Sequence, residues 1–136
     1  MKKYLIIILS TCIPISSQAE EPLKNRATQT ITAECTTEAT GVDGVRNDCL
    51  SKKSIITAPD NFVFIQNGIE GGEISGNGDN HGCRFEWGQM TEVVKGSGIT
   101  QPKTFSLEAY ARSPSGHLSG RGWASCSYTL SMTAYN

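Results

Sequence analysis

The stretch from Trp123 to Ala134, with the sequence WASCSYTLSMTA, is the clearest predicted strand of the chain. Small polar residues, all serine or threonine, fill alternate positions between Ser125 and Thr133. The residues between them face the other way and are mostly apolar: Ala124, Cys126, Tyr128, Leu130 and Met132. A period of two is that of a β-strand with one buried face. We therefore predict a half-buried strand here, with Cys126 directed into the core.

Two other segments show the same alternation. In Thr104–Arg112 the inward series is Phe105, Leu107, Ala109 and Ala111. In Thr28–Cys35 threonines alternate with Ile31, Ala33 and Cys35. Both segments are predicted to be half-buried strands. We expect the last two strands of the chain to form an antiparallel hairpin with a long loop.

The middle of the chain suggests further strands and their turns. Phe62–Ile65 is apolar on both faces, which favours a central strand or one covered on both sides. The pair Asn67-Gly68 is a typical hairpin turn, after which residues 69–75 would return alongside. Inward residues change parity at Gly88, which predicts a β-bulge or bend there.

Composition supports an all-β domain. The chain has 14 glycines and is rich in serine and threonine, without long runs of helix-forming residues. Six to eight short strands separated by turns predict a small antiparallel β-sandwich stabilised by disulfides. The alternative is a small, partly open β-barrel.

The first 19 residues have the features of a cleavable bacterial export signal. Lys2 and Lys3 precede a short apolar stretch, and Ser17-Gln18-Ala19 is a small-x-small cleavage site. The apolar stretch is shorter than the roughly 20 residues that span a bilayer, so we expect no membrane span. The alternative reading is a lipoprotein signal with Cys12 as the lipidated residue. Residues 20–136 then form a single β-rich domain, exported to the periplasm or secreted.

Four cysteines remain after Ala19, and an oxidising compartment favours their pairing. Cys35 and Cys49 enclose a short, turn-rich stretch around residues 41–44. This leaves Cys83 to pair with Cys126, joining two predicted strands. Two other pairings stay open from the sequence.

Charge argues against a nucleic-acid partner. Residues 20–136 hold ten basic and thirteen acidic side chains, and no segment concentrates lysine or arginine.

Residues suited to catalysis or metal binding are few. His81 and His117 each lie in a glycine-rich segment without a recognisable triad. Asn77, Asp79 and His81 resemble the start of a calcium loop, but Gly88 stands where its closing acidic residue belongs. We therefore predict no metal and no cofactor. Two glutamates predicted to face outward, Glu86 and Glu108, are the carboxylate pair that could serve in glycoside hydrolysis.

The sequence holds better candidates for recognition than for catalysis. Tyr110 and Trp123 are predicted to face outward on partner strands, with three polar residues near them in sequence: Arg112, His117 and Arg121. An aromatic pair with cationic neighbours suits a protein or a glycan. The alternative is that Trp123 packs into a second sheet.

The expected function is therefore binding, not catalysis. An exported inhibitor, immunity protein or adhesin-like module that recognises a protein or glycan fits these residues. Two other classes stay open: an oligomeric structural or toxin-associated subunit, and a small secreted hydrolase.

Overall fold

The structure is a computed structural model that describes residues 26–39, 44–115 and 120–135. The expected export signal, Cys12, His117 and most of the loop around residues 41–44 lie outside the described residues. Seven strands make up the described chain: β1 (Ala27–Thr36), β2 (Asp48–Leu50), β3 (Ser54–Thr57), β4 (Phe62–Asn77), β5 (Asn80–Glu92), β6 (Thr100–Arg112) and β7 (Trp123–Ala134). All pairings are antiparallel.

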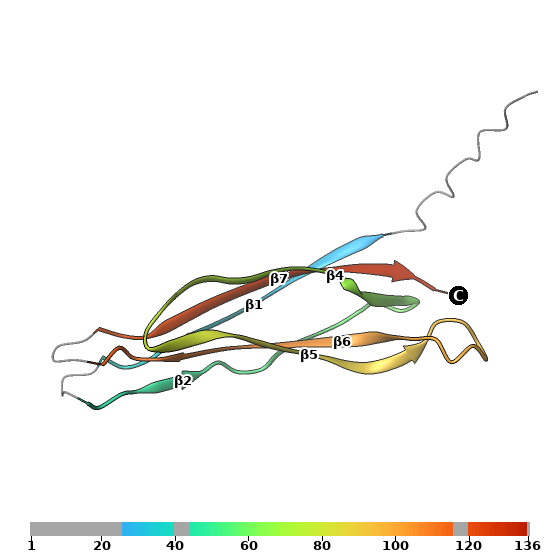
Figure 1. The fold of residues 1–136 in the computed structure, drawn as a ribbon. Helices are drawn as coiled ribbons and strands as arrows, with labels where there is room; N and C mark the ends of the chain where they lie inside the picture. The colour runs from blue at the N-terminus through green and yellow to red at the C-terminus, as the bar shows by residue number, and fades with distance from the viewer. Residues whose placement is uncertain (1–25, 40–43, 116–119, 136) are drawn as a thin grey trace, which may run out of the picture.

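The strands form two sheets that pack face to face as an elongated β-sandwich, which confirms the predicted fold class (Figure 1). One sheet, called sheet A here, has the order β1-β7-β4, and the other, sheet B, has β6 at its centre. In sheet B, β5 pairs along one edge of β6, while β2 and β3 pair in succession along the other. Ser51 bridges the gap between β2 and β3, because its backbone N–H donates to the Ala109 carbonyl and its hydroxyl accepts from the Ala109 N–H.

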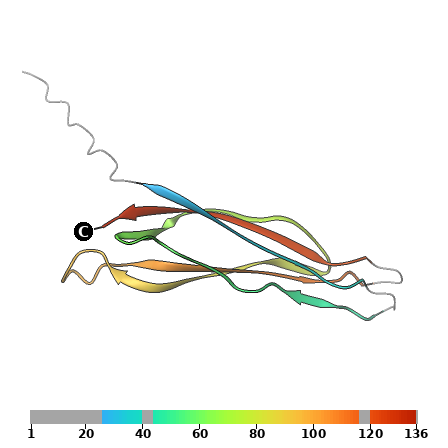
Figure 2. The same cartoon turned by 180° about the vertical axis from the view of Figure 1, so that it is seen from behind.

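The prediction that the last two strands form a hairpin is wrong. β6 and β7 are the central strands of opposite sheets, and their inward faces meet across the core (Figure 2). The segment between them, from Ser113 to Gly122, is much longer than the two to five residues of ordinary hairpin loops. It is therefore long enough to cross from one sheet to the other.

The predicted hairpin at Asn67-Gly68 is also wrong. Both residues lie inside the single long strand β4, which is an edge strand and not a central one. Val63 and Phe64 are both fully buried, which fits the other alternative, a segment covered on both sides. A type I′ turn needs positive φ at both central residues, and neither Asn67 nor Gly68 has it. Gly68 lies instead against Ser131 of β7, where a Cβ would come within 2.7 Å of the serine Cβ. The strand register with β7 shifts here, between Phe64 and Ile69.

At Gly88 the register between β5 and β6 is continuous, so no residue is inserted and the predicted bulge is absent. The local irregularity is at the next residue, Gln89, which has φ 46°. Gln89 is also missing from the ladder with β6, where Gly88 pairs with Thr104 and Met90 pairs with Pro102, so the ladder is interrupted there without an inserted residue.

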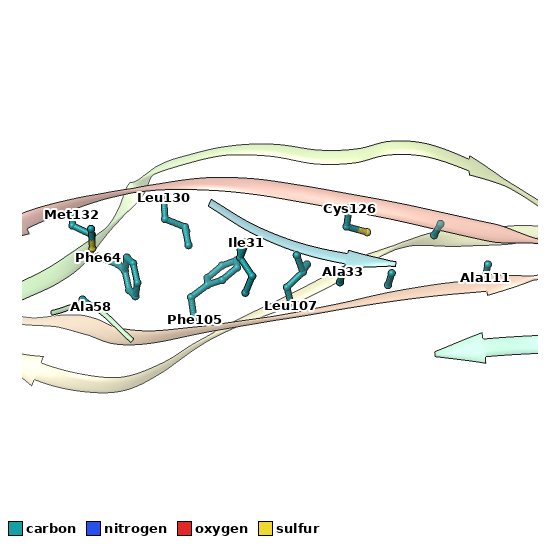
Figure 3. Close-up of a cluster of buried hydrophobic side chains, with 12 residues drawn as sticks. Ile31, Ala33, Ala58, Phe64, Phe105, Leu107, Ala111, Cys126, Leu130 and Met132 are labelled. Atoms are coloured by element: carbon teal, nitrogen blue, oxygen red, sulfur yellow. The ribbon is translucent and has the colours of Figure 1, made fainter. Parts of the chain in front are cut away.

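The alternation seen in the sequence places the core correctly. Phe105 and Leu107 of β6 and Leu130 of β7 are fully buried, as predicted. Figure 3 shows them meeting Phe64, Ile31 and Met132 between the sheets. Phe105 also contacts the rings of Trp87 and Phe85 on the edge strand β5, with centroids 4.9 and 5.4 Å away, although Phe85 stays 42% exposed.

Both disulfides join the two sheets, and the pairing is the one favoured from the sequence. Cys35–Cys49 links β1 to β2, and Cys83–Cys126 links β5 to β7, with Cα–Cα distances of 5.9 and 6.0 Å. Packed sheets ordinarily lie about 10 Å apart, so these crosslinks draw the sheets together. Small side chains occupy the core of this half of the sandwich: Ala33, Ala109, Ala111 and Ala124.

Candidate recognition site

The described residues among those predicted for recognition share one end of the sandwich but not one face. Tyr110 and Arg112 alternate with the buried Ala109 and Ala111, so they lie on the outer face of sheet B. Trp123 alternates with the buried Ala124 and lies on the outer face of sheet A. The predicted Tyr110–Trp123 patch therefore does not form, because the two strands belong to different sheets.

Trp123 is exposed on a polar surface. Its side chain is 40% exposed, and its partners on the neighbouring strands are Thr36 and Asn77. Arg121, near Trp123 in sequence, lies 3.7 Å from the carboxylate of Glu38. Trp123 thus has no apolar cross-strand partner.

Tyr110 has more contacts with neighbouring residues than Trp123 has, and its position depends on a glycine. The residue paired with it on β5 is Gly82, where a Cβ would lie only 2.8 Å from the Tyr110 hydroxyl oxygen. The phenol ring can lie against β5 because Gly82 has no side chain. The guanidinium of Arg84 lies 4.6 Å from the ring centroid, a cation–π contact.

Arg112 is held by Asp48 of β2, its direct neighbour across the strands. Its Nε and Nη2 donate to the two carboxylate oxygens of Asp48 over 2.7 and 3.0 Å. These hydrogen bonds lower the pKa of the Asp48 carboxyl below its ordinary value and raise the pKa of Arg112. The two-pronged geometry fixes the guanidinium plane at the surface.

Between these groups lies a hollow of about 220 Å³. Its side-chain lining, called the Tyr110 site below, comes from strands β2, β5 and β6: Asp48, Leu50, Asn80, Arg84, Tyr110 and Arg112. Leu50 is paired with Tyr110 and is 56% exposed. The hollow is smaller than the roughly 300–1,000 Å³ of small-molecule pockets, and it suits one inserted side chain.

A second ion pair stands at the corner where β4 passes to β5. Arg46 pairs with the carboxylate of Asp79. Burial alone would raise the pKa of Asp79, but hydrogen bonds from Ser115 and the Arg46 guanidinium outweigh it, so the net pKa is lowered. The backbone N–H of Asp79 also donates to the Arg112 carbonyl, which ties this corner to β6.

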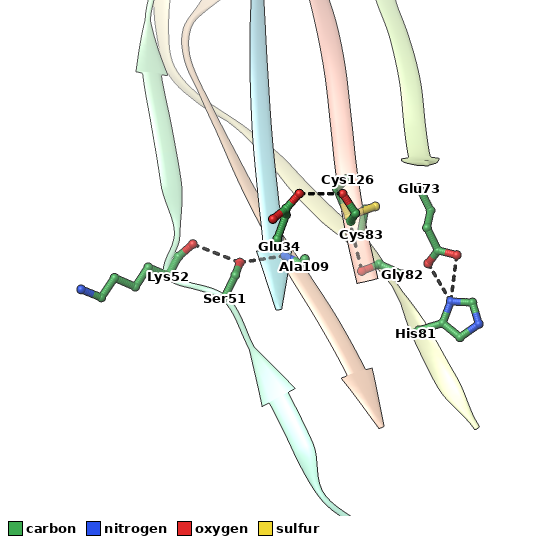
Figure 4. Close-up of a disulfide and its surroundings, with 10 residues drawn as sticks. Glu34, Ser51, Lys52, Glu73, His81, Gly82, Cys83, Ala109 and Cys126 are labelled. Atoms are coloured by element: carbon green, nitrogen blue, oxygen red, sulfur yellow. Dashed lines mark hydrogen bonds and ion pairs between the residues drawn. A yellow bond between two sulfur atoms is a disulfide. The ribbon is translucent and has the colours of Figure 1, made fainter. Parts of the chain in front are cut away.

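The three metal candidates engage separate partners. Asn77 donates to the Arg121 carbonyl, Asp79 pairs with Arg46, and His81 pairs with Glu73. Nδ1 of His81 is 2.8 Å from both carboxylate oxygens of Glu73, a contact between β5 and β4 drawn in Figure 4. Among the described residues, no group of three or more His, Cys, Asp or Glu side chains could hold a metal ion.

The candidate carboxylates lie on the open outer face of sheet B. Glu86 is paired with Ser106, Glu108 with Arg84, so the two glutamates are diagonal neighbours. Glu86 is 74% exposed and lies 3.4 Å from the ammonium of Lys53. Neither glutamate lines the hollow of the Tyr110 site.

Sequence reasoning identified Tyr110 and Arg112 but missed Leu50, Arg84 and Asp48. Alternation within β6 placed Tyr110 outward, but only the sheet pairing brings Arg84 of β5 beside it. Leu50 and Asp48 belong to a three-residue strand too short to show a period.

Comparisons with protein-family models, curated proteins and solved structures gave no match for this chain. Within the described part of the chain, no helix is long and apolar enough to cross a membrane. The two disulfides are typical of proteins from an oxidising environment.

Proposed function

We propose that this chain is an exported binding protein that recognises a folded protein partner through the Tyr110 site. The observation that carries the proposal is the pairing of an exposed Leu50 with Tyr110, between a cation–π pair and a two-pronged ion pair. Aromatic residues and arginine are enriched in protein interfaces, and a central apolar contact with a polar rim is their usual anatomy. Export from a bacterial cell, to the periplasm or beyond, is part of the same proposal.

A protein is favoured over a glycan by the environment of the Tyr110 ring. A sugar that stacks on an aromatic residue needs an open ring face, and Arg84 lies over this one. The Tyr110 site offers instead a small hollow beside an exposed leucine. Trp123, which has an exposed indole, stands among polar neighbours on the other sheet.

The charges of the hollow indicate what it accepts. Its lining includes the guanidinium groups of Arg84 and Arg112 but only the carboxylate of Asp48, which already pairs with Arg112. Arg84 lies over the Tyr110 ring and, although Glu108 is its cross-strand partner, forms no ion pair among the described residues, so it can attract an anionic group. We infer that the partner inserts an acidic side chain here and packs an apolar residue on Leu50, so binding should weaken as salt rises.

The test is affinity capture with the oxidised protein from periplasm, culture medium and host extract, followed by direct binding to the purified partner. Leu50→Asp and Arg84→Gln should each weaken binding about tenfold or more, as for a central interface residue. Ile74→Asp is the matched control, because Ile74 is 68% exposed on β4 of the other sheet. Changing His81 and His117 to Ala should leave binding unaltered.

Two results would contradict the proposal. A partner bound equally by wild type and by Leu50→Asp would place recognition outside the Tyr110 site. Binding that is lost only when Trp123 is replaced would favour a glycan ligand or a binding surface on sheet A. If light scattering shows that the protein forms an oligomer of many copies, and Leu50→Asp dissociates it, the chain would instead be an oligomeric structural subunit.

A further inference from the structure

A second cavity lies at the other end of the sandwich. It has a volume of about 710 Å³ and lies where the C-terminal end of β7 approaches the turn between β5 and β6 (Figure 1). Both sheets contribute to its walls: Arg26, Val63, Ile65, Val93, Val94, Lys95, Gln101, Thr133, Ala134 and Tyr135. No residue of this end cavity belongs to the Tyr110 site.

The size and walls of the end cavity suit a small apolar molecule. Its volume falls within the roughly 300–1,000 Å³ of small-molecule pockets. Val63 is fully buried, Ile65 and Val93 are half-buried, and Val94 is 55% exposed. These four aliphatic side chains therefore run from the interior to the surface, as a pocket for an apolar chain requires.

The charge at the end cavity is one-sided. Arg26 and Lys95 both line it, and none of the described aspartates or glutamates does. Within the described residues neither cation forms an ion pair. Two unpaired cations beside an aliphatic wall are complementary to a molecule that is apolar at one end and anionic at the other.

A buried amide adds a third feature. Gln101 lines the cavity, and its Oε1 is buried without a hydrogen-bond partner in the described structure. An unpaired buried acceptor costs free energy, about 1–3 kcal/mol in mutational series. Because Oε1 has no exposed surface, the terminal amide would have to rotate for this oxygen to accept from a donor in the cavity.

We propose that the end cavity binds a small amphipathic anion that carries an apolar chain, an N–H group and a terminal carboxylate. N-acylated amino acids and the C-terminal residues of apolar peptides share this chemistry. The chain packs on the four aliphatic residues, the carboxylate lies between Arg26 and Lys95, and the N–H donates to Gln101.

Four probes separate the parts of this proposal, each titrated below its micelle concentration by calorimetry. N-dodecanoylglycine has all three features, dodecanoate lacks the N–H, and dodecyltrimethylammonium carries the opposite charge. The N-acetylated dipeptide of valine and leucine, with a free carboxylate, represents the peptide source. We expect saturable binding of N-dodecanoylglycine or the dipeptide, weaker binding of dodecanoate and none of the cation. Amide signals of Ile65 and Val93 should shift in NMR spectra.

Variants assign the contacts. Arg26→Glu with Lys95→Glu should weaken binding of the anions by about tenfold or more, since two attractions become repulsions. Lys52→Glu with Arg121→Glu changes the net charge equally away from the cavity and should have no such effect. Gln101→Leu should abolish the preference for N-dodecanoylglycine over dodecanoate without lowering the melting temperature.

Three results would overturn the inference. These are no binding of either N-acyl probe, equal binding of the cationic probe, or equal losses from the Arg26/Lys95 and Lys52/Arg121 pairs. If the Gln101→Leu variant keeps the full preference for N-dodecanoylglycine over dodecanoate, Gln101 does not contact the N–H group of the ligand. Because none of these substitutions touches the Tyr110 site, the outcome is independent of the proposed function.

Discussion

The two disulfides should differ in how much they stabilise the fold. In the chain-entropy account, a crosslink stabilises the native state by restricting the unfolded chain, and more so for a longer loop. Cys35 and Cys49 are separated by 14 residues, whereas Cys83 and Cys126 are separated by 43. These separations correspond to about 3 and about 4 kcal/mol at 25 °C.

Burial increases the difference. Cys126 has no exposed surface and belongs to the buried core cluster, so its replacement by alanine also removes packed volume. The two loops do not overlap along the chain, so their contributions should add. Replacing Cys83 and Cys126 together should therefore cost at least about 1 kcal/mol more than replacing Cys35 and Cys49.

The assay is thermal unfolding by circular dichroism or calorimetry of both double-alanine variants. At roughly 4 °C per kcal/mol for a domain of this size, the Cys83/Cys126 variant should melt at least about 4 °C below the other. Mass spectrometry after thiol alkylation shows that the remaining disulfide is intact in each. Equal melting temperatures, or a lower one for the Cys35/Cys49 variant, would refute the argument from loop length and burial.

Three further predictions concern a charge, a glycine and the chain start. The Asp48 carboxyl should titrate below its ordinary pKa of 3.8 in the folded protein, so its stabilising contribution is present above that pH and is lost as the pH falls through the lower folded value. Arg112→Gln should return the NMR titration midpoint of the Asp48 carboxyl toward 3.8. An unmoved midpoint would show that the Arg112 hydrogen bonds do not cause the lowered pKa. Gly71→Ala should destabilise the domain by about 3 kcal/mol or more in urea unfolding, since φ is 120° and a Cβ would lie 2.2 Å from the Ser127 carbonyl oxygen. Gly96→Ala is the control, with φ 77° and open space around it, and should cost only about 1 kcal/mol; equal losses would show that the close contact is unimportant. The exported protein should begin at Glu20, which mass spectrometry of the intact chain measures, and a start at a lipidated Cys12 would replace this reading.

Much of the candidate site could not be predicted, because it depends on which strands are neighbours. Alternation along a strand states which side chains share a face, so Tyr110 and Arg112 were correctly assigned outward positions. It does not state which sheet the strand joins. Trp123 was placed beside Tyr110 on the assumption of a hairpin, and the assignment of β6 and β7 to opposite sheets separates them.

Turn residues also have more than one use. Asn67-Gly68 has the composition of a hairpin turn, but Gly68 serves the close approach of β4 to Ser131 on β7. Because glycine has no side chain, it suits both a tight turn and a close contact between strands. The sequence around Gly68 does not distinguish these two uses.

Alternation and composition predicted the fold class and the inward positions of Ile31, Phe105 and Leu130, and spacing favoured the cysteine pairing that the structure shows. These properties follow from periods of two and from short-range spacing, which local physical chemistry dictates. Three features depend instead on how the sheets pack: β6 and β7 face each other across the core, Leu50 meets Tyr110, and the end cavity joins residues from Arg26 to Tyr135. Such contacts join residues far apart in the chain, and their formation depends on how both sheets pack as a whole, which no local pattern records.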